Sequence, residues 1–272
     1  MKRFFSLIFL VLVHFGIHSQ ESISLVSWNI RDFGKSKNSA ELEQIAEIVR
    51  DADILAIQEV VAGYGGAQAV AKLSDILNRK GAQWDYVISD PTNSSKYVTE
   101  RYAFIWKTRH IKIKNRGALI KDLVYLVDRE PFYLDFYLDG EKVTVLNFHS
   151  RPHDNNPEAE IAAISAYLAK NDSYHPIILA GDFNVDEKEA VFDEIKGLDF
   201  KAAISNQPTT LKHACDGHNY LNYPIDNIFY RGVRKEKGSV IDFVKVCENL
   251  EDSRKLSDHL PVYLSFSLLN AN

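Results

Sequence analysis

Apolar residues recur with the period of a helix in three segments of the chain. The first follows the spacing i, i+3, i+4, i+7 of a helix face that packs on a core: Leu42, Ile45, Ala46 and Val49. Two further groups have the same character: Val70, Leu73 and Leu77, and Ile161, Ile164 and Leu168. Pro157 and an acidic first turn precede the last group, as is typical of a helix start. The pattern therefore predicts three amphipathic helices.

Apolar runs of strand length alternate with these helices. The predicted strands cover residues 23–28, 53–60, 102–106, 132–138, 142–148, 176–181, 225–230 and 260–266. Asp139-Gly140 separates two of them, which is a strong signal for a β-hairpin. The run 53–60 is nearly all apolar, as expected for a strand that is covered on both faces. Because no long linker or repeat interrupts the alternation, we expect one α/β domain over residues 20–272, with two stacked sheets and helices outside.

The first nineteen residues have the features of a secretory signal peptide. Lys2 and Arg3 precede an apolar run over residues 4–15, and small residues stand at Gly16 and Ser19. The run is shorter than the ~20 residues that a membrane-spanning helix needs, which disfavours the alternative of an uncleaved anchor. The sequence therefore predicts a signal peptide over residues 1–19 and a secreted or periplasmic protein. Export would place Cys215 and Cys247 in an oxidising compartment, where either a disulfide or two buried thiols is possible.

The charge of the chain narrows the classes of function. A content of 46% hydrophobic and 25% charged residues is that of an ordinary globular protein and excludes disordered and collagen-like chains. The formal charge is −5, and loss of the signal peptide with its two basic residues makes it −7. A protein that coats nucleic acid should be basic. The acidity therefore excludes that class but leaves open an enzyme that binds an anionic substrate transiently.

Polar and ionisable residues cluster where the apolar strands are interrupted. Five clusters stand out: Trp28-Asn29-Ile30-Arg31, Gln58-Glu59, Asn147-Phe148-His149-Ser150, Gly181-Asp182-Phe183-Asn184 and Ser257-Asp258-His259. Any one of them alone could be a turn or a half-buried imidazole. Together they predict one site that is assembled from the ends of several strands.

The residue types in these clusters suit the hydrolysis of a phosphate ester. Hard oxygen donors that suit Mg²⁺, Mn²⁺ or Ca²⁺ are present at Glu59, Asp182, Asp258, Asn29 and Asn184. His149 and His259, with an ordinary pKa of about 6.5, exchange protons near neutral pH. In such a site a metal offsets charge on phosphorus, one imidazole takes a proton from water, and the other protonates the leaving oxygen.

The order of the motifs resembles the endonuclease/exonuclease/phosphatase superfamily and, within it, the deoxyribonuclease I branch. The matching stretches span nearly the whole mature chain: Asn29-Ile30-Arg31, Phe33-Gly34, Gln58-Glu59-Val60, Glu100-Arg101-Tyr102, Arg129-Glu130-Pro131, His149-Ser150, Gly181-Asp182-Phe183-Asn184, Asp226 and Ser257-Asp258-His259-Leu260-Pro261-Val262. The stretches at 100–102 and 129–131 favour this branch over abasic-site endonucleases, inositol phosphatases and sphingomyelinases. The resemblance implies a four-layer α/β/β/α sandwich of two packed mixed sheets flanked by helices.

The resemblance also implies roles for single residues. Asp226 would orient His259 as the general base, and Glu100 would orient His149 as the acid for the 3′ leaving oxygen. Asp182 and Asn184 would position the water and the scissile phosphate. The implied metal ligands are Glu59, Asn29 and Asp258, for Mg²⁺ or Mn²⁺, with a structural Ca²⁺ as a further expectation. The implied substrate contacts are Arg31, Arg129 and Tyr97.

Three departures from the family pattern bear on the substrate. Val61 replaces the arginine that contacts the minor groove, and the groove-stacking tyrosine falls on Val98, with Tyr97 one residue off. Tyr223 stands where the family has a structural cysteine, and Cys215 lies further from Asp226. These changes leave the hydrolytic residues in place but remove expected contacts to a duplex.

The sequence thus predicts a secreted, monomeric, divalent-metal-dependent phosphodiesterase. Its first expected activity is a DNA endonuclease that leaves 5′-phosphate and 3′-hydroxyl ends, binds nucleic acid transiently and has no stable membrane association. Alternatives on the same fold are RNA, a phospholipid or a small phosphodiester as substrate, and a non-catalytic secreted binding module. A zinc site at His213, Cys215, Asp216 and His218 is a weaker reading, since a second, separated ligand pair is missing.

Overall fold

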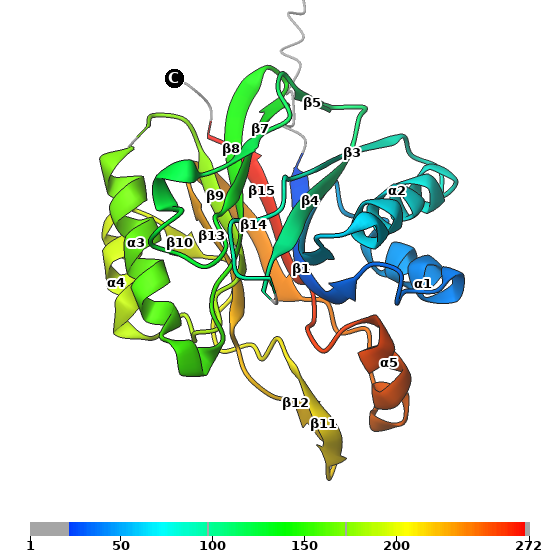
Figure 1. Cartoon of the computed structure of the whole chain (residues 1–272). Helices are drawn as coiled ribbons and strands as arrows, with labels where there is room; N and C mark the ends of the chain where they lie inside the picture. Colours follow the sequence, from blue (N-terminus) through cyan, green and yellow to red (C-terminus); the bar gives the residue numbers. More distant parts are fainter. Residues whose placement is uncertain (1–21, 97, 172, 270–272) are drawn as a thin grey trace, which may run out of the picture.

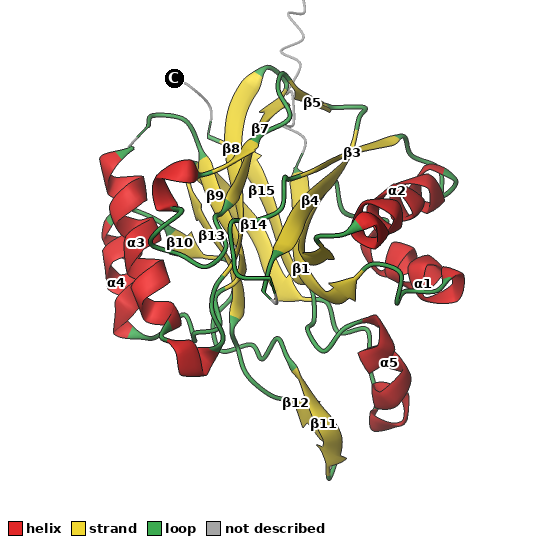
Figure 2. Cartoon of the chain, in the orientation of Figure 1, coloured by secondary structure: helices red, strands yellow, loops and turns green. Residues whose placement is uncertain are grey.

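A computed structural model describes residues 22–96, 98–171 and 173–269 of the chain. The signal peptide predicted for residues 1–19 and the substrate contact predicted at Tyr97 lie outside the described residues. Two mixed sheets pack against each other in the middle of the molecule, and helices cover the outer face of each (Figures 1 and 2). This arrangement confirms the four-layer α/β/β/α sandwich that the sequence predicts.

The first sheet has the strand order β14-β15-β1-β2-β4-β3. Its strands are β1 (Ile23–Phe33), β2 (Ile54–Val61), β3 (Trp84–Ile88), β4 (Glu100–Lys107), β14 (Val233–Val240) and β15 (Val262–Leu268). β1 and β2 are parallel, whereas the other neighbours in this sheet pair antiparallel. The outer face is covered by α1 (Ser39–Val49) and α2 (Tyr64–Asn78), whose apolar stripes are those that the sequence predicts.

The second sheet has the strand order β10-β13-β9-β8-β7-β5, with β6 paired to β7. Its strands are β5 (Ile111–Ile113), β6 (Ala118–Leu119), β7 (Phe132–Leu138), β8 (Glu141–His149), β9 (Ile177–Asp182), β10 (Lys201–Ala202) and β13 (Asp226–Arg231). α3 (Pro157–Lys170) and α4 (Asp193–Gly197) cover the outer face. β8 and β9 run parallel and so close together that a Cβ on Gly181 would meet the Phe148 carbonyl oxygen at 1.8 Å, which only glycine avoids.

Apolar side chains from the inner faces of both sheets form the central core. Phe104 and Trp106 of β4 contact Phe136 of β7 edge-on, with ring centroids 5.5 and 5.7 Å apart. β7 alternates buried and half-buried residues, so one face enters the core while the other faces α3. Burial of one such aromatic side chain stabilises the fold by about 1.5–3 kcal/mol. The core therefore fixes the position of one sheet relative to the other, and with it the positions of the polar clusters at the sheet edge.

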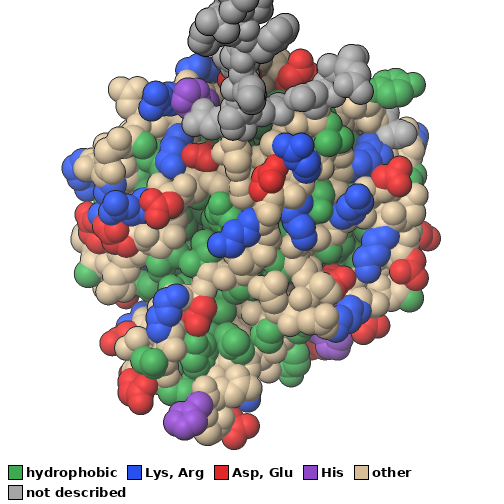
Figure 3. Space-filling model, turned by 180° about the vertical axis from the view of Figure 1, so that it is seen from behind, with side chains coloured by type: hydrophobic (Ala, Val, Ile, Leu, Met, Phe, Trp, Pro, Cys, Tyr) green, Lys and Arg blue, Asp and Glu red, His purple; other side chains and the backbone are tan. Residues whose placement is uncertain are grey.

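The structure contains strands that the apolar pattern does not predict. β14 carries Arg234, Lys235 and Lys237 at exposed positions, since it is the edge strand of the first sheet. Charged side chains are usual on such an edge because they oppose pairing with another chain. On the face seen in Figure 3, basic and acidic side chains are interspersed over the surface rather than gathered by sign.

A small hairpin projects from the sandwich beside α5 (Leu250–Leu256), as Figures 1 and 2 show. It consists of β11 (Leu211–Asp216) and β12 (Asn219–Leu221), and a separate apolar cluster with Leu250 and Leu260 lies under it. The Cys215–Cys247 disulfide, with an Sγ–Sγ distance of 2.09 Å, joins the hairpin to the short helix η4 (Cys247–Asn249). The two cysteines therefore form a disulfide and are not two buried thiols. The zinc reading is wrong, because the Cys215 sulfur is bonded to its partner.

The remaining short helices are η1 (Lys121–Leu123), η2 (His153–Asn155) and η3 (Ala190–Phe192). Within residues 22–96, 98–171 and 173–269, no helix combines the length and the hydrophobicity needed to cross a bilayer.

Candidate active site

The predicted polar clusters meet at one edge of the sandwich, the lower edge in Figure 1. β1, β2, β8 and β9 end at this edge, and their antiparallel neighbours β4, β13 and β15 begin there. Ile23 pairs with Phe266 at the opposite edge, where the described part of the chain begins and ends. The sequence predicts that the polar clusters stand at the ends of strands. The cluster Ser257-Asp258-His259 instead lies in the loop before β15. It reaches the site because β15 runs antiparallel to β1.

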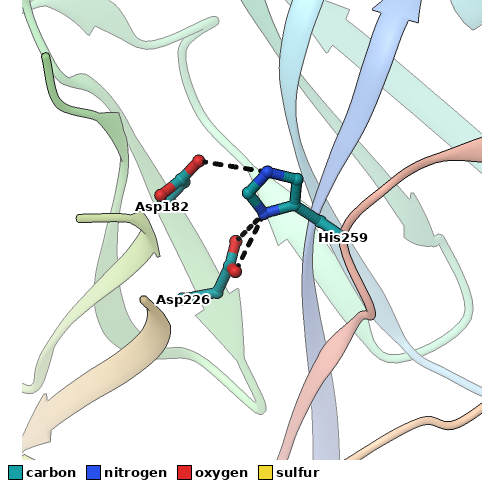
Figure 4. Close-up of side chains that lie close together, drawn as sticks. All are labelled: Asp182, Asp226 and His259. Carbon is teal, nitrogen blue, oxygen red and sulfur yellow. Dashed lines mark hydrogen bonds and ion pairs between the residues drawn. The ribbon is translucent and has the colours of Figure 1, made fainter. Parts of the chain in front are cut away.

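His259 and Asp226 form the first acid–histidine pair. His259 Nδ1 lies 3.1 and 2.9 Å from the two carboxylate oxygens of Asp226, as Figure 4 shows. The Thr209 hydroxyl donates to the same carboxylate at 2.6 Å. A ring nitrogen that donates to a carboxylate fixes the tautomer of the imidazole, so Nε2 is the nitrogen available for proton exchange.

His149 and Glu100 form the second pair, from β8 and the start of β4. His149 Nδ1 lies 3.1 and 3.0 Å from the two oxygens of Glu100. The buried Arg129 guanidinium lies 3.2 Å from Glu100 Oε2, which His149 also contacts, and donates to the Ser150 carbonyl at 2.7 Å. Both pairs therefore have the composition that the family resemblance implies.

Asp182 lies between the two imidazoles. Its Oδ2 is 3.6 Å from His149 Nε2 and 3.7 Å from His259 Nε2. The backbone N–H of Asn184 donates to the other oxygen at 2.9 Å and so fixes the carboxylate. Both imidazoles thus use Nδ1 for their own acid and present Nε2 to one shared point, which is the arrangement that a base and an acid on opposite sides of one phosphorus require.

The surrounding carboxylates raise the pKa of both imidazoles. Burial by itself lowers the pKa of His259, but Asp226 and Asp182 outweigh it and raise the pKa to about 10. Burial also lowers the pKa of His149, while Glu100 raises it, Arg129 lowers it again and Asp182 raises it, and the balance lies above the ordinary value. The Arg129 guanidinium beside Glu100 therefore gives His149 an electrostatic environment that differs from that of His259.

The donors beside Asp182 fit a hard divalent cation. Asn29 donates from Nδ2 to Glu59 at 3.0 Å and to Asp182 at 3.1 Å, which brings two carboxylates to one amide. The Asn29 Oδ1 atom is buried and has no hydrogen-bond partner among the described residues. Rotation of the amide by about 180° would turn Oδ1 toward the two carboxylates, where a bound cation would provide its partner. Ligand atoms of Asp182, Asp226 and His259 also lie within 4.8 Å of one another.

Asp258 forms ion pairs with two arginines. Its carboxylate lies 3.5 Å from Arg31 and 3.6 Å from Arg254, so two guanidinium groups face it. Its predicted role as a metal ligand stays a prediction. The predicted phosphate contacts differ in exposure: the Arg31 side chain is half-exposed, whereas that of Arg129 is buried beside Glu100. Arg129 is thus placed to position Glu100, and a contact to substrate stays a prediction.

Two site residues adopt backbone conformations that side chains rarely take. Glu59 has φ of 58° and Asn184 has φ of 54°, both in the left-handed region. At Glu59 the register between β2 and its neighbours shifts, so the strand bulges and directs the carboxylate toward Asn29. Strain of this kind is common at functional sites.

Three further residues position the site, although the sequence predicted no role for them. Trp28 Nε1 donates to the His259 carbonyl at 2.8 Å. The buried Ser257 hydroxyl donates to the Asn29 carbonyl at 2.6 Å and accepts from the His259 N–H at 3.0 Å. Trp28 and Ser257 stand inside predicted clusters and could have been found there, but Thr209 lies in a stretch without any pattern, and only the folded chain brings it to Asp226.

Comparisons with known proteins agree with the geometry. A profile of the Endonuclease/Exonuclease/phosphatase family matches residues 26–259. The chain is 27% identical to deoxyribonuclease gamma of Homo sapiens over 282 residues, which covers 93% of this chain and 88% of that protein. It is 31% identical to deoxyribonuclease-1 of Oryctolagus cuniculus over 184 residues, 61% of this chain and 62% of that protein.

A solved structure shows the same fold. An endonuclease/exonuclease/phosphatase family protein from Leptotrichia buccalis C-1013-b superposes with a TM-score of 0.67, covering 90% of this chain and 100% of that one. The sequence identity of 16% means that this likeness concerns the fold alone.

Proposed function

The chain belongs to the endonuclease/exonuclease/phosphatase family, and we propose that it is an exported, divalent-metal-dependent DNA endonuclease that leaves 5′-phosphate and 3′-hydroxyl ends. The observation that carries this proposal is the placement of two acid–histidine pairs on either side of Asp182. A binding module without catalysis would have no need for two oriented imidazoles that share one carboxylate.

In this mechanism neutral His259 takes the proton of the attacking water at Nε2. The carboxylates around the imidazole raise its pKa to about 10, and a divalent cation held beside Asp182 would offset part of their charge and lower that pKa, so that Nε2 could accept the proton. Asp226 holds the imidazole through Nδ1 and stabilises the imidazolium that results. His149 gives its Nε2 proton to the leaving 3′ oxygen, and Glu100 orients it in the same way. Asp182 and Asn184 position the water and the scissile phosphate between the two rings.

Asn29, Glu59 and Asp182 are the residues that would hold the divalent cation, with Asp258 as a further candidate. A cation of this kind stabilises negative charge that develops on the phosphate oxygens. Mg²⁺ or Mn²⁺ suits the all-oxygen donor set. The net charge of −7 after export supports transient binding of a polyanion, since few Lys or Arg contacts would retain it.

DNA is the first proposed substrate because both relatives described above are deoxyribonucleases, one of them matched over 93% of this chain. A substrate panel tests it: the purified mature protein is incubated with plasmid DNA, RNA and sphingomyelin vesicles in Mg²⁺ plus Ca²⁺. We expect nicking and linearisation of the plasmid, with 5′-phosphate ends that a ligase joins without prior kinase treatment. Preferential turnover of RNA or sphingomyelin would replace the DNA assignment while retaining the phosphodiesterase.

Two further measurements test the mechanism. His259→Ala and His149→Ala should each lower kcat on the best substrate by about 10³-fold, since each removes one partner of general acid–base catalysis. EDTA should abolish turnover, and added Mg²⁺ should restore it. Unchanged thermal melting of both variants is the control for folding. Full activity of either variant would refute the assignment of base and acid.

A further inference from the structure

A cavity of about 720 Å³ opens directly beside the catalytic centre. Asn184, whose backbone holds Asp182, lines it, and so does Ile225, which precedes Asp226 in the chain. Its volume is that of a site for a small molecule or one building block of a polymer. A group bonded to a phosphate held between the two imidazoles could therefore enter it.

One wall of the cavity is apolar and carries an exposed aromatic ring. Val185, Pro224 and Ile225 line it together with Tyr223, which is 62% exposed. Exposed tyrosine rings are stacking surfaces for flat aromatic groups, and each of the nucleobases can stack on them.

The other walls carry four carboxylates. Asp154 and Glu158 come from η2 and the start of α3, and Asp186 and Glu189 from the segment after β9. His153 also lines the cavity, so the four carboxylates outnumber the one basic side chain there. In the described part of the chain, no Lys or Arg lines the cavity or forms an ion pair with any of the four. A second phosphate would be repelled there, because the backbone of a nucleic acid is held by basic side chains. A group rich in N–H donors would instead find acceptors on several sides.

From these walls we propose that the cavity binds one unpaired nucleobase of the nucleotide next to the scissile phosphate. The base stacks on Tyr223, and its N–H groups donate to the carboxylates. This inference rests on the proposed nuclease function and specifies its substrate: a strand with an accessible base, single or locally opened, because a base stacked in a duplex does not reach a side pocket unless it is extruded.

The donor pattern of the bases predicts a preference. Guanine offers two adjacent N–H groups to one carboxylate, and cytosine and adenine each offer an amino group. Thymine presents a single N–H between two carbonyl oxygens, which the carboxylates repel. We therefore expect thymine to be the least favoured base at this position and guanine the most favoured.

Random-sequence single-stranded DNA, followed by sequencing of the cleaved ends, tests the inference on the mature protein with Mg²⁺. Thymine should be depleted relative to guanine by about tenfold at one position flanking the cut, the lower range for a good bidentate contact. The double variant Glu158→Gln with Asp186→Asn should flatten this preference. Anisotropy of labelled oligonucleotides in EDTA should show the same order of affinities without turnover.

An abasic oligonucleotide isolates the role of the ring. Removal of the base at the preferred position should lower kcat/KM by about tenfold for the wild type and for Tyr223→Phe, but have little effect on Tyr223→Leu, which lacks the ring. Tyr174→Leu is the matched control, since Tyr174 is a fully exposed tyrosine just before the start of β9, whereas the cavity lies beyond the other end of that strand. Its rates should equal those of the wild type.

The outcomes separate the two proposals. If no nucleic acid is cut, the nuclease function fails and the inference fails with it. If DNA is cut with no base preference and no abasic effect, only the inference is overturned. If Tyr223→Leu and the double variant lower hydrolysis of sphingomyelin but not of DNA, the cavity binds a cationic headgroup and the nucleobase assignment is wrong.

Discussion

The two acid–histidine pairs share one geometry but have different supports. Glu100 contacts both His149 and the buried Arg129, so its charge is shared between an imidazole and a guanidinium. Asp226 contacts His259 and the neutral Thr209 hydroxyl, and no Lys or Arg of the described residues pairs with it. The comparison teaches that a carboxylate in such a pair has two functions, orientation and charge compensation, and that the second depends on what else contacts it.

The pairs also differ in how they are attached to the fold. His149 lies on β8, in the interior of the second sheet between β7 and β9. His259 lies in a loop whose neighbours bond to the segment at the start of the hairpin: the Leu260 N–H donates to Thr209 at 2.6 Å, and the Leu211 N–H donates to Asp258 at 2.8 Å. The disulfide fixes this hairpin to η4. The interior of a sheet thus holds His149, whereas His259 is held partly by β1, through Trp28 and Ser257, and partly by the cross-linked hairpin.

Replacement of the residues that contact the two carboxylates, Arg129 and Thr209, should produce the largest difference in stability between the pairs. Arg129→Met should lower the free energy of unfolding by about 3–5 kcal/mol, because it breaks a buried ion pair and leaves Glu100 with less compensation. Thr209→Val should cost about 2 kcal/mol, the loss of one hydrogen bond to a charged group. Urea unfolding measures both. Equal losses would mean that Arg129 contributes no more to the site than a neutral donor.

Removal of the disulfide should affect the His259 side alone. The double variant Cys215→Ser with Cys247→Ser should lose about 2–4 kcal/mol, since the bond closes a loop with a sequence separation of 32 residues. Hydrogen exchange should speed up at the Leu211 and Leu260 amides and stay unchanged in β8. A uniform increase over both sheets would contradict this difference in how His149 and His259 are held.

The pH dependence of stability should show a smaller difference between the pairs. The pKa of His259 is raised to about 10 in the folded protein, against about 6.5 in an unfolded chain. Its stabilisation is therefore complete below pH 6.5 and disappears as the pH rises through 10. Melting in EDTA from pH 6 to 10 should show this decline, and His259→Gln should reduce it more than His149→Gln. An unaltered slope in His259→Gln would assign the decline to other groups.

The periodic parts of the chain were predictable because their signal is local. The apolar stripes of α1, α2 and α3 and the runs of β2, β7 and β9 are visible in the sequence, since burial on one or both faces imposes their composition. β14 and the hairpin β11–β12 were not, because an edge strand and an exposed hairpin carry polar residues without a period. Their pairing comes from neighbours far along the chain.

For the active site and the net charge, too, some features follow from the local sequence and others from the fold. The sequence by itself determined the residue types that we propose as catalytic, their order along the chain and the net negative charge. Only the tertiary structure decided that both Nε2 atoms face Asp182, that Arg129 contacts Glu100 and that Cys215 bonds Cys247. The physical reason is that residue types follow from local burial and chemistry, whereas distances between strand ends depend on how two sheets pack, which no short stretch of sequence encodes.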